Sequence, residues 1–265
     1  MLRSLAVQLY SLREKAENDF VGILKKLADI GYQAVEPAGF WNLRPSEFKR
    51  VIDGLGLKMY SSHSPWARSN NLGEVMKMAD ILGLNKVVCG YGPREFQDLD
   101  AIKRTAEATS KMQEILARNG LLLFQHNHNF EFERLNGRLK YEIYAELCPN
   151  VQFQIDAFWS TNFGTEDALE MLKLFADRTI LLHLKDGLLK QTQAELKVTR
   201  GTLDRKIELR ALGSGELNIT SLIANLPETV DNIVVELDYC NIDMVAAIKM
   251  SYKYMTENSL AVGNK

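Results

Sequence analysis

The chain has 265 residues, of which 46% are hydrophobic and 25% charged, so one large α/β domain or two small ones can bury a sizeable core. Its formal net charge of −2 does not favour a protein that binds a phosphate backbone, because such a protein needs a basic face. No apolar run approaches the roughly 20 residues that cross a bilayer, and the run at 4–10 is too short for a secretory signal, so we expect neither a nucleic-acid nor a membrane partner.

Short apolar or β-branched runs alternate with longer segments of helical spacing along the first half of the chain. Gly31 marks the expected end of the first helix, and Ser46 is expected to cap the second. In chain order, the predicted elements are strand 4–10, helix 19–31, strand 32–37, helix 46–56, strand 57–63, helix 71–83, strand 85–90, helix 98–119 and strand 121–127.

The same alternation continues in the second half, where Thr165 is expected to cap the helix that follows it. In chain order, the predicted elements are helix 141–147, strand 150–156, helix 166–176, strand 179–185, helix 220–226, strand 232–237 and helix 241–256. Two stretches interrupt the alternation. The run FEFERLNGRLKY at 130–141 predicts a small hairpin that turns at Asn136-Gly137, and residues 187–218 form a long polar excursion, either a solvated insertion or an active-site loop.

Eight predicted strands with helices between them indicate parallel pairing and right-handed crossovers. We therefore predict an α/β fold, a single (β/α)8 TIM barrel over residues 1–265 with a parallel eight-stranded barrel and its active site at the C-terminal face. The alternative is an open doubly wound sheet. That fold usually carries a glycine-rich loop after its first strand, and residues 9–13 contain no glycine.

All four histidines fall at or near the carboxyl ends of predicted strands: His63, His126, His128 and His183. Side chains of a strand alternate between its two sides, so His126 and His128 are expected to point to the same side, while Asn127 points outward or bridges to a neighbour. The HNH element can therefore place two imidazoles in one cavity.

Three further strand ends carry metal-ligating side chains: Asp156 ends one strand, and His183 and Glu236 lie near the ends of the next two. With an imidazole from the HNH element they make a set of nitrogen and oxygen donors that suits a divalent cation with open positions for substrate. Two imidazoles favour Mn²⁺, Co²⁺ or Zn²⁺ over Mg²⁺. A lone aspartate at a strand end is more often a loop cap, so the prediction depends on the four residues lying together.

Other residues at strand ends are weaker candidates. Glu36 is either a substrate contact or a helix cap, and His63 is either a substrate ligand or a group behind one. Lys185 shares a face with His183 and could reach the cavity. Tryptophans that follow strands could wall a sugar face, although each alone is more often packing; they are Trp41, Trp66 and Trp159.

The motifs VQLYSLRE, GYQAVEPAG, HNHNFEFE, QIDAFWSTNFG, LLHLKDG, LGSGELN and IVVELDY, in this order, resemble the xylose-isomerase-like TIM-barrel family, the group of sugar phosphate isomerases and epimerases. The resemblance covers nearly the whole chain. It implies a divalent metal held by Asp156, His183 and Glu236, with His126 at the position where many members have glutamate. His128 is then a substrate contact or an alternate ligand.

The resemblance also implies the chemistry. Glu236 is expected to act as the base that removes a proton next to a carbonyl to form an enediolate, and a second base could be His126, His128 or Lys185. Trp159, Glu36, His63 and Asp186 are expected substrate contacts.

The leading hypothesis is a metal-dependent isomerase or epimerase of a small sugar, keto-sugar or sugar phosphate. A lyase or dehydratase that uses the same enediolate stays open, and so does a non-catalytic sugar-binding barrel. A DNA-repair nuclease of the same superfold is disfavoured, because its metal cluster needs more histidines than this chain has. Three cysteines without metal-like spacing, Cys89, Cys148 and Cys240, predict reduced thiols in a cytoplasmic protein, and self-association is left open.

Overall fold

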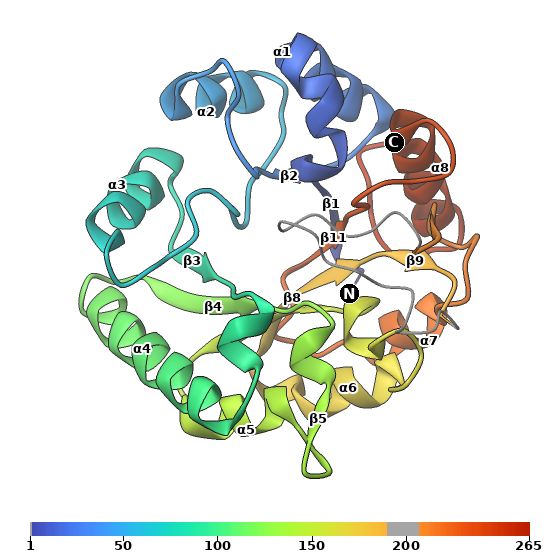
Figure 1. The fold of residues 1–265 in the computed structure, drawn as a ribbon. Helices are drawn as coiled ribbons and strands as arrows, with labels where there is room; N and C mark the ends of the chain where they lie inside the picture. The colour runs from blue at the N-terminus through green and yellow to red at the C-terminus, as the bar shows by residue number, and fades with distance from the viewer. Residues whose placement is uncertain (1, 190–206) are drawn as a thin grey trace.

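The computed structural model describes residues 2–189 and 207–265 and forms a ring of helices around a curled parallel sheet (Figure 1). The sheet order is β2-β1-β11-β8-β7-β4-β3. Its strands are β1 (Ser4–Gln8), β2 (Ala34–Glu36), β3 (Lys86–Cys89), β4 (Leu122–His126), β7 (Gln152–Asp156), β8 (Thr179–Leu184) and β11 (Asn232–Val235).

The strands of the sheet that come first and last in the chain, β1 and β11, are neighbours. β1 pairs in parallel with β2 on one side and with β11 on the other. An open doubly wound sheet would reverse its strand order near the middle, whereas this order follows the chain around a circle. The predicted TIM-barrel architecture is therefore confirmed.

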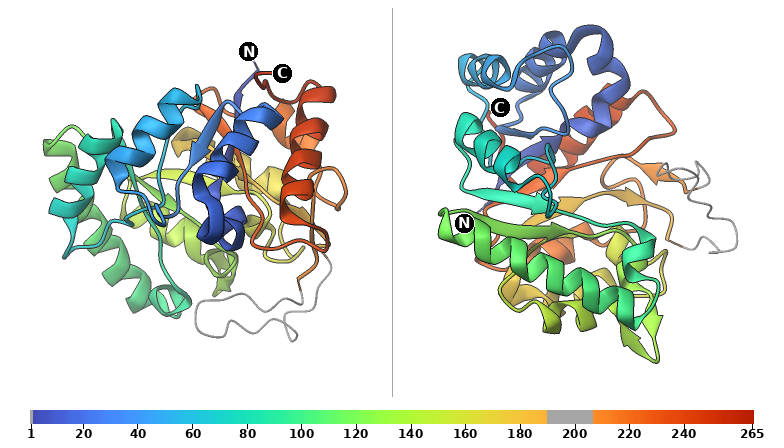
Figure 2. Two further views of the ribbon diagram at one scale, coloured as in Figure 1. Left: turned by 90° about the horizontal axis from the view of Figure 1, so that it is seen from above. Right: turned by 60° about the vertical axis from the view of Figure 1, so that its left-hand side comes forward.

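The helices cover the outside of the sheet, as the two views of Figure 2 show from other directions. Both chain ends lie at one end of the barrel, where Leu5 N donates to Val262 O at 3.1 Å. The helices are α1 (Arg13–Ile30), α2 (Pro45–Gly54), α3 (Leu72–Leu82), α4 (Leu99–Arg118), α5 (Lys140–Leu147), α6 (Ala168–Leu174), α7 (Ile219–Ala224) and α8 (Met244–Glu257).

The prediction of a regular strand at 57–63 is wrong. This segment makes a single bridge to β2, between Ala34 and Lys58, and Ala67 N then donates to Val88 O of β3 at 2.7 Å. Its remaining polar groups bond elsewhere: the Ser61 hydroxyl donates to a glutamate side chain, and His63 N donates to a loop carbonyl at 2.7 Å. The segment fills the gap between β2 and β3 without a continuous hydrogen-bond ladder.

Three predicted helix starts also need correction. α2 begins at Pro45, which has no N–H to be satisfied, so Ser46 lies inside the helix. Asp167, not Thr165, caps α6, and its carboxylate accepts from the N–H of Glu170 at 3.0 Å. The helix predicted from residue 19 starts at Arg13; residue 19 is an internal kink with a φ of −154°.

Each of the two segments that interrupt the alternation contains a small two-stranded sheet. β5 (Arg134–Leu135) and β6 (Arg138–Leu139) form the predicted hairpin, with Asn136 and Gly137 both at positive φ in the turn. β9 (Asp186–Gly187) pairs antiparallel with β10 (Leu209–Arg210), so the excursion leaves and returns side by side. Residues 190–206 of that excursion lie outside the described residues.

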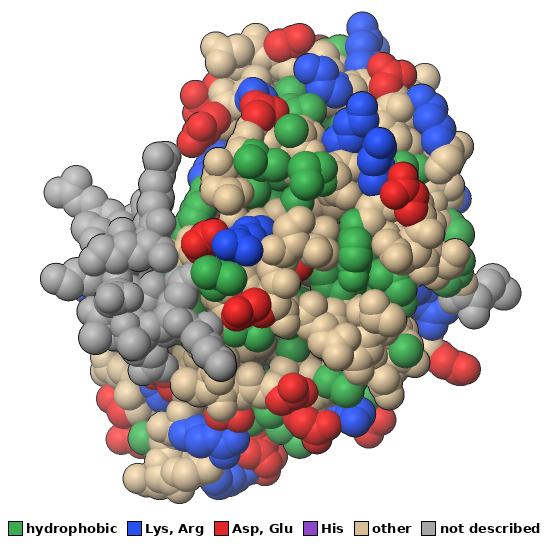
Figure 3. All heavy atoms as spheres, turned by 90° about the vertical axis from the view of Figure 1, so that its right-hand side faces the viewer, with side chains coloured by type: hydrophobic (Ala, Val, Ile, Leu, Met, Phe, Trp, Pro, Cys, Tyr) green, Lys and Arg blue, Asp and Glu red, His purple; other side chains and the backbone are tan. Residues whose placement is uncertain are grey.

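The surface carries charges of both signs. On the face drawn in Figure 3, acidic and basic side chains are interspersed over the described part of the chain. Within the described residues, no helix combines the length and apolar character needed to cross a membrane.

Candidate metal centre

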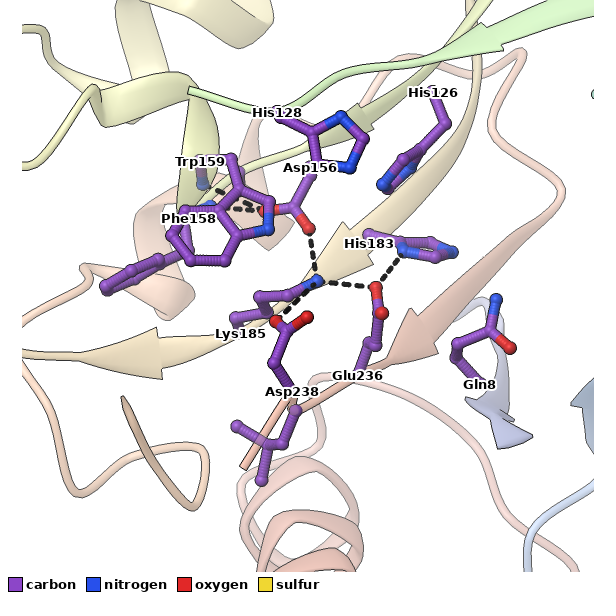
Figure 4. A network of polar contacts seen from close by, with 12 residues as sticks. Gln8, His126, His128, Asp156, Phe158, Trp159, His183, Lys185, Glu236 and Asp238 are labelled. Atoms are coloured by element: carbon purple, nitrogen blue, oxygen red, sulfur yellow. Dashed lines mark hydrogen bonds and ion pairs between the residues drawn. The ribbon is translucent and has the colours of Figure 1, made fainter. Parts of the chain in front are cut away.

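Four predicted ligands from four different elements converge in the structure. His126 and Asp156 are the last residues of β4 and β7, His183 lies one residue before the end of β8, and Glu236 directly follows β11. One donor atom of each lies within 4.8 Å of the donor atoms of the other three, and all four residues are buried. The expected gathering of these side chains at the carboxyl ends of the strands is thus observed (Figure 4).

The His183 imidazole lies between two carboxylates. It donates from Nε2 to Glu36 Oε1 and from Nδ1 to Glu236 Oε2, both at 2.7 Å. Burial alone would lower the His183 pKa, but the two glutamates raise it to about 9. Glu36 therefore holds the Nε2 side of the ring, which is how partners behind a metal ligand orient it, and a metal at Nδ1 would replace the proton that Nδ1 donates to Glu236.

His126 is oriented by a glutamine below it. The Gln154 amide donates to Glu36 Oε2 at 2.8 Å, so its oxygen is the acceptor for His126 Nδ1 at 3.1 Å and for His63 Nε2 at 2.7 Å. With its proton on Nδ1, His126 presents the lone pair of Nε2. Burial lowers the His126 pKa well below its ordinary value, which keeps the ring neutral as metal ligation requires.

Asp156 also has one fixed oxygen and one directed at the centre. Its Oδ1 accepts from the backbone N–H of Phe158 at 3.1 Å and of Trp159 at 2.9 Å. Its Oδ2 accepts from Lys185 Nζ at 2.6 Å. The Asn127 side chain ties this strand end to β4, because its oxygen accepts from Asp156 N at 2.9 Å. Of the two alternatives that the sequence left open for Asn127, the structure shows the bridge.

The donor chemistry of the cluster fits a divalent metal ion. Two imidazoles and two carboxylates are ligands for Mn²⁺, Co²⁺ or Zn²⁺. Three of the four, namely His126, Asp156 and His183, are also fixed through an atom that faces away from the centre. The cluster could therefore bind a metal. A second group of three imidazoles, those of His63, His126 and His183, overlaps it.

Lys185 is buried beside these ligands. Its Nζ lies 2.6 Å from Asp156 Oδ2, 2.5 Å from Glu236 Oε2 and 3.8 Å from Asp238 Oδ2. Burial alone would lower the Lys185 pKa, but the three carboxylates raise it above its ordinary value, so the side chain is an ammonium. The sequence predicted that Lys185 could reach the cavity; the structure buries it between the carboxylates (Figure 4), and it is not among the residues that line the cavity.

A cavity of about 390 Å³ opens onto the cluster, which is within the range of about 300–1,000 Å³ typical of small-molecule sites. Aromatic side chains form much of its wall, namely Tyr10, Trp66, Tyr91, Phe130 and Tyr239. Its polar side chains include His63, His126, His128, Glu236 and Asp238. The His126 and His128 ring centroids are 5.2 Å apart in this cavity, which agrees with the prediction that they share one side of the strand.

Two predicted substrate contacts lie away from the cavity wall. Glu36 is buried behind His183, and Trp159 is buried with its ring centroid 5.3 Å from that of Phe158. Trp66 takes the place expected of Trp159, because it lines the cavity with its ring 5.3 Å from the His63 ring. Nothing in the sequence separated the two tryptophans, since both follow strand ends.

The structure gives Asp186 a structural role in place of the expected substrate contact. Its Oδ1 accepts from Gly187 N at 2.9 Å and Leu217 N at 3.1 Å, and its Oδ2 accepts from Gly213 N and Gly215 N, both at 2.9 Å. A Cβ atom on Gly215 would lie 2.1 Å from Asp186 Oδ1. The LGSGEL motif is therefore the backbone clamp around this carboxylate.

Sequence reasoning missed two residues of this site, Gln154 and Asp238. Gln154 orients His126 and His63, and Asp238 lines the cavity. Each lies two positions from a predicted ligand, in QFQID and in ELD, and so falls on the same side of the chain. The alternation that identified His128 beside His126 could have identified both.

Comparisons with known proteins agree with this fold. A family model described as a xylose isomerase-like TIM barrel matches residues 24–256. Similar solved structures include a sugar phosphate isomerase/epimerase from Parabacteroides distasonis (TM-score 0.76, 22% identity, 99% of this chain and 96% of the other). Also similar is a probable 3-DHS dehydratase from Bacillus anthracis, with a TM-score of 0.74 and 13% identity over 96% of this chain and 98% of the other. An L-ribulose 3-epimerase has a TM-score of 0.70 and 16% identity over 98% of this chain and 96% of the other. No curated protein matches the sequence significantly.

Proposed function

The chain belongs to the xylose isomerase-like TIM barrel family, and from this premise we propose that it is a metal-dependent isomerase or epimerase of a small sugar, keto-sugar or sugar phosphate. One observation carries the proposal: the cluster of two imidazoles and two carboxylates lies beside a cavity of sugar-site size with an aromatic wall. Aromatic faces suit the apolar faces of sugar rings, and polar groups at one end suit their hydroxyls.

The metal would be held by His126, Asp156, His183 and Glu236. A divalent cation bound there supplies Lewis-acid polarisation of a carbonyl oxygen. Two structural neighbours support this choice of chemistry by their names, the sugar phosphate isomerase/epimerase and the L-ribulose 3-epimerase.

Glu236 is the proposed base. Burial alone would raise its pKa, but Lys185 and His183 hold the pKa well below its ordinary value, so the carboxylate is ionised at neutral pH. It lines the cavity and can therefore take the proton from the carbon next to a substrate carbonyl. Return of a proton to the neighbouring carbon isomerises the sugar, and return to the opposite face of the same carbon epimerises it.

His128 is the proposed second proton-transfer group. It lies on the loop after β4, lines the cavity, and its buried Nδ1 has no hydrogen-bond partner among the described residues. Burial lowers its pKa to about 4, so the ring is neutral at pH 7 and can accept or relay a proton. The Phe130 ring stacks on it at 5.5 Å, which fixes its plane.

Elimination is the second candidate, and the dehydratase among the structural neighbours favours it. The same proton abstraction by Glu236 would then be followed by loss of a hydroxyl group from the next carbon, with no return of the proton. The hydroxyl would leave as water with a proton that the neutral His128 ring relays from solvent.

Solvent deuterium separates the two reactions. The full chain, loaded with Mn²⁺, is incubated in D₂O with a panel of keto-sugars and their phosphates, and the products are followed by NMR. We expect one deuterium at the carbon next to the carbonyl of an isomerised or epimerised product, because Glu236 exchanges its proton with solvent. An unsaturated product would establish elimination instead, and neither exchange nor product with any sugar would contradict both. Protein stripped with a chelator is the control and should be inactive.

A further inference from the structure

We propose that Lys185 and a divalent metal ion compete for the same two carboxylates, and that Asp238 receives the Lys185 ammonium when the metal binds. The inference rests on the proposed metal-dependent function. It makes Lys185 a positioning residue that couples occupation of the metal centre to the charge at the cavity wall.

The competition follows from which oxygens Lys185 contacts. Lys185 Nζ contacts Asp156 Oδ2, and Asp156 has no other oxygen to offer, because its Oδ1 accepts from two backbone N–H groups. Lys185 Nζ also contacts Glu236 Oε2, the oxygen that faces His183 Nδ1. These are the atoms that would turn to a metal at the centre of the cluster.

The two cations would compete at these oxygens. A metal ion would lie about 2.0–2.2 Å from a ligating carboxylate oxygen, whereas the ammonium lies 2.6 Å from Asp156 Oδ2 and 2.5 Å from Glu236 Oε2. The three side chains are buried, and like charges repel strongly where water is excluded. We therefore expect binding of a divalent ion to draw Lys185 away from at least one of the two oxygens.

Asp238 lies where the displaced ammonium can go. Its Oδ2 is 3.8 Å from Lys185 Nζ, is buried, and has no hydrogen-bond partner among the described residues. Figure 4 shows the Asp238 carboxylate beside the end of the lysine side chain, on the side away from His126. The Trp159 ring lies beside the ammonium, with its centroid 5.6 Å from Nζ. Its cation–π interaction can stabilise the ammonium as it moves towards Asp238.

The displacement would change the cavity as well as the centre. Asp238 lines the cavity, so a lysine paired with it would present an N–H donor to a bound sugar. Binding of the metal would therefore also bring the Lys185 ammonium to the cavity wall, where it faces the substrate.

The test is a double-mutant cycle on metal affinity, measured by calorimetry with MnCl₂ on the full chain after chelator treatment. Lys185→Met keeps a long side chain and removes its charge, so we expect Mn²⁺ to bind at least about tenfold more tightly. Asp238→Asn removes the receiving carboxylate, so Mn²⁺ should bind about fivefold or more weakly in the wild-type background. In the Lys185→Met background the same Asp238→Asn change should alter affinity less than about twofold, because no ammonium needs a new partner.

A matched control removes one positive charge elsewhere. Lys140 is a buried lysine paired with Glu133, and Lys140→Met should leave Mn²⁺ affinity within about twofold of wild type. If Lys185→Met does not fold, Lys185→Gln replaces it, since the amide can still donate to one carboxylate.

The outcomes separate two failures. If wild-type protein binds no Mn²⁺, the metal-dependent function itself is wrong. If wild-type protein binds Mn²⁺ but Lys185→Met binds it no more tightly, only the competition is wrong. An equal effect of Asp238→Asn in both backgrounds would show that Asp238 attracts the metal directly and does not receive the lysine.

Discussion

Replacement of Glu236 by Gln is expected to lower turnover about 10²–10⁴-fold at saturating Mn²⁺ while the barrel stays folded. Glutamine fills the same volume and keeps one oxygen for a metal, but it has no carboxylate to accept a proton. The loss should appear in kcat, measured with the sugar identified by deuterium incorporation, and solvent exchange at the substrate carbon should fall by the same factor.

The matched variant for this prediction is Asp156→Asn. Asp156 is the other carboxylate of the cluster, but it is not among the residues that line the cavity. Its loss should weaken Mn²⁺ binding, and excess Mn²⁺ should restore kcat to within about tenfold of wild type, since no proton passes through it. Equal and unrestored losses in the two variants would mean that Glu236 serves only as a ligand.

Replacement of Glu36 by Ala is expected to lower the free energy of unfolding by about 3–5 kcal/mol, because it breaks a buried ion pair and leaves the partner charge without compensation. Glu36 is fully buried and accepts from Gln8 Nε2 at 2.6 Å, Gln154 Nε2 at 2.8 Å, His183 Nε2 at 2.7 Å and the Ser61 hydroxyl. Chemical denaturation at neutral pH measures the change.

A surface glutamate provides the control for Glu36. Glu107 forms an exposed ion pair with Lys111 one helical turn away, and exposed pairs of this kind contribute little to stability. Glu107→Ala should leave the unfolding midpoint unchanged. A Glu36→Ala midpoint equal to that of Glu107→Ala would contradict a central role for the buried network.

The same network predicts how stability depends on pH. Burial alone would raise the Glu36 pKa, but His63 and His183 lower it from 4.5 to about 2, so its contribution is complete above about pH 4.5 and is lost as pH falls towards 2. The His183 pKa is raised from 6.5 to about 9, so its contribution is complete below about pH 6.5 and is lost as pH rises through 9. The ion pair therefore stabilises most between about pH 4.5 and 6.5, and Glu36→Gln should flatten the acid side of the stability profile.

The barrel could be predicted because its signals are local and repeated. Seven of the eight predicted strands are apolar runs between helices, and each forms a strand of the sheet. The run at 57–63 has the same apolar start, but Ser61 and His63 use their polar groups on Glu36, Gln154 and the loop after β2 instead of a ladder. Sequence spacing does not reveal that competition between side-chain and backbone partners.

The site was predictable to the extent that strand ends meet at one edge of a barrel. That rule brought Asp156, His183, Glu236 and an imidazole of the HNH element together without any knowledge of distances, and the family resemblance singled out His126 as that imidazole. It could not tell which polar side chains at that edge face the cavity and which are hydrogen-bonded to other parts of the protein. Asp186 is the clearest case, because three of the four N–H groups that satisfy its carboxylate come from loop residues 27 to 31 positions away.

The most direct test of the account is a crystal structure of the full chain soaked in MnCl₂, with the metal located by its anomalous scattering. We predict one strong peak about 2.0–2.2 Å from a donor atom of each of His126, Asp156, His183 and Glu236. A peak bound only by the imidazoles of His63, His126 and His183, or no peak near Asp156 and Glu236, would contradict it.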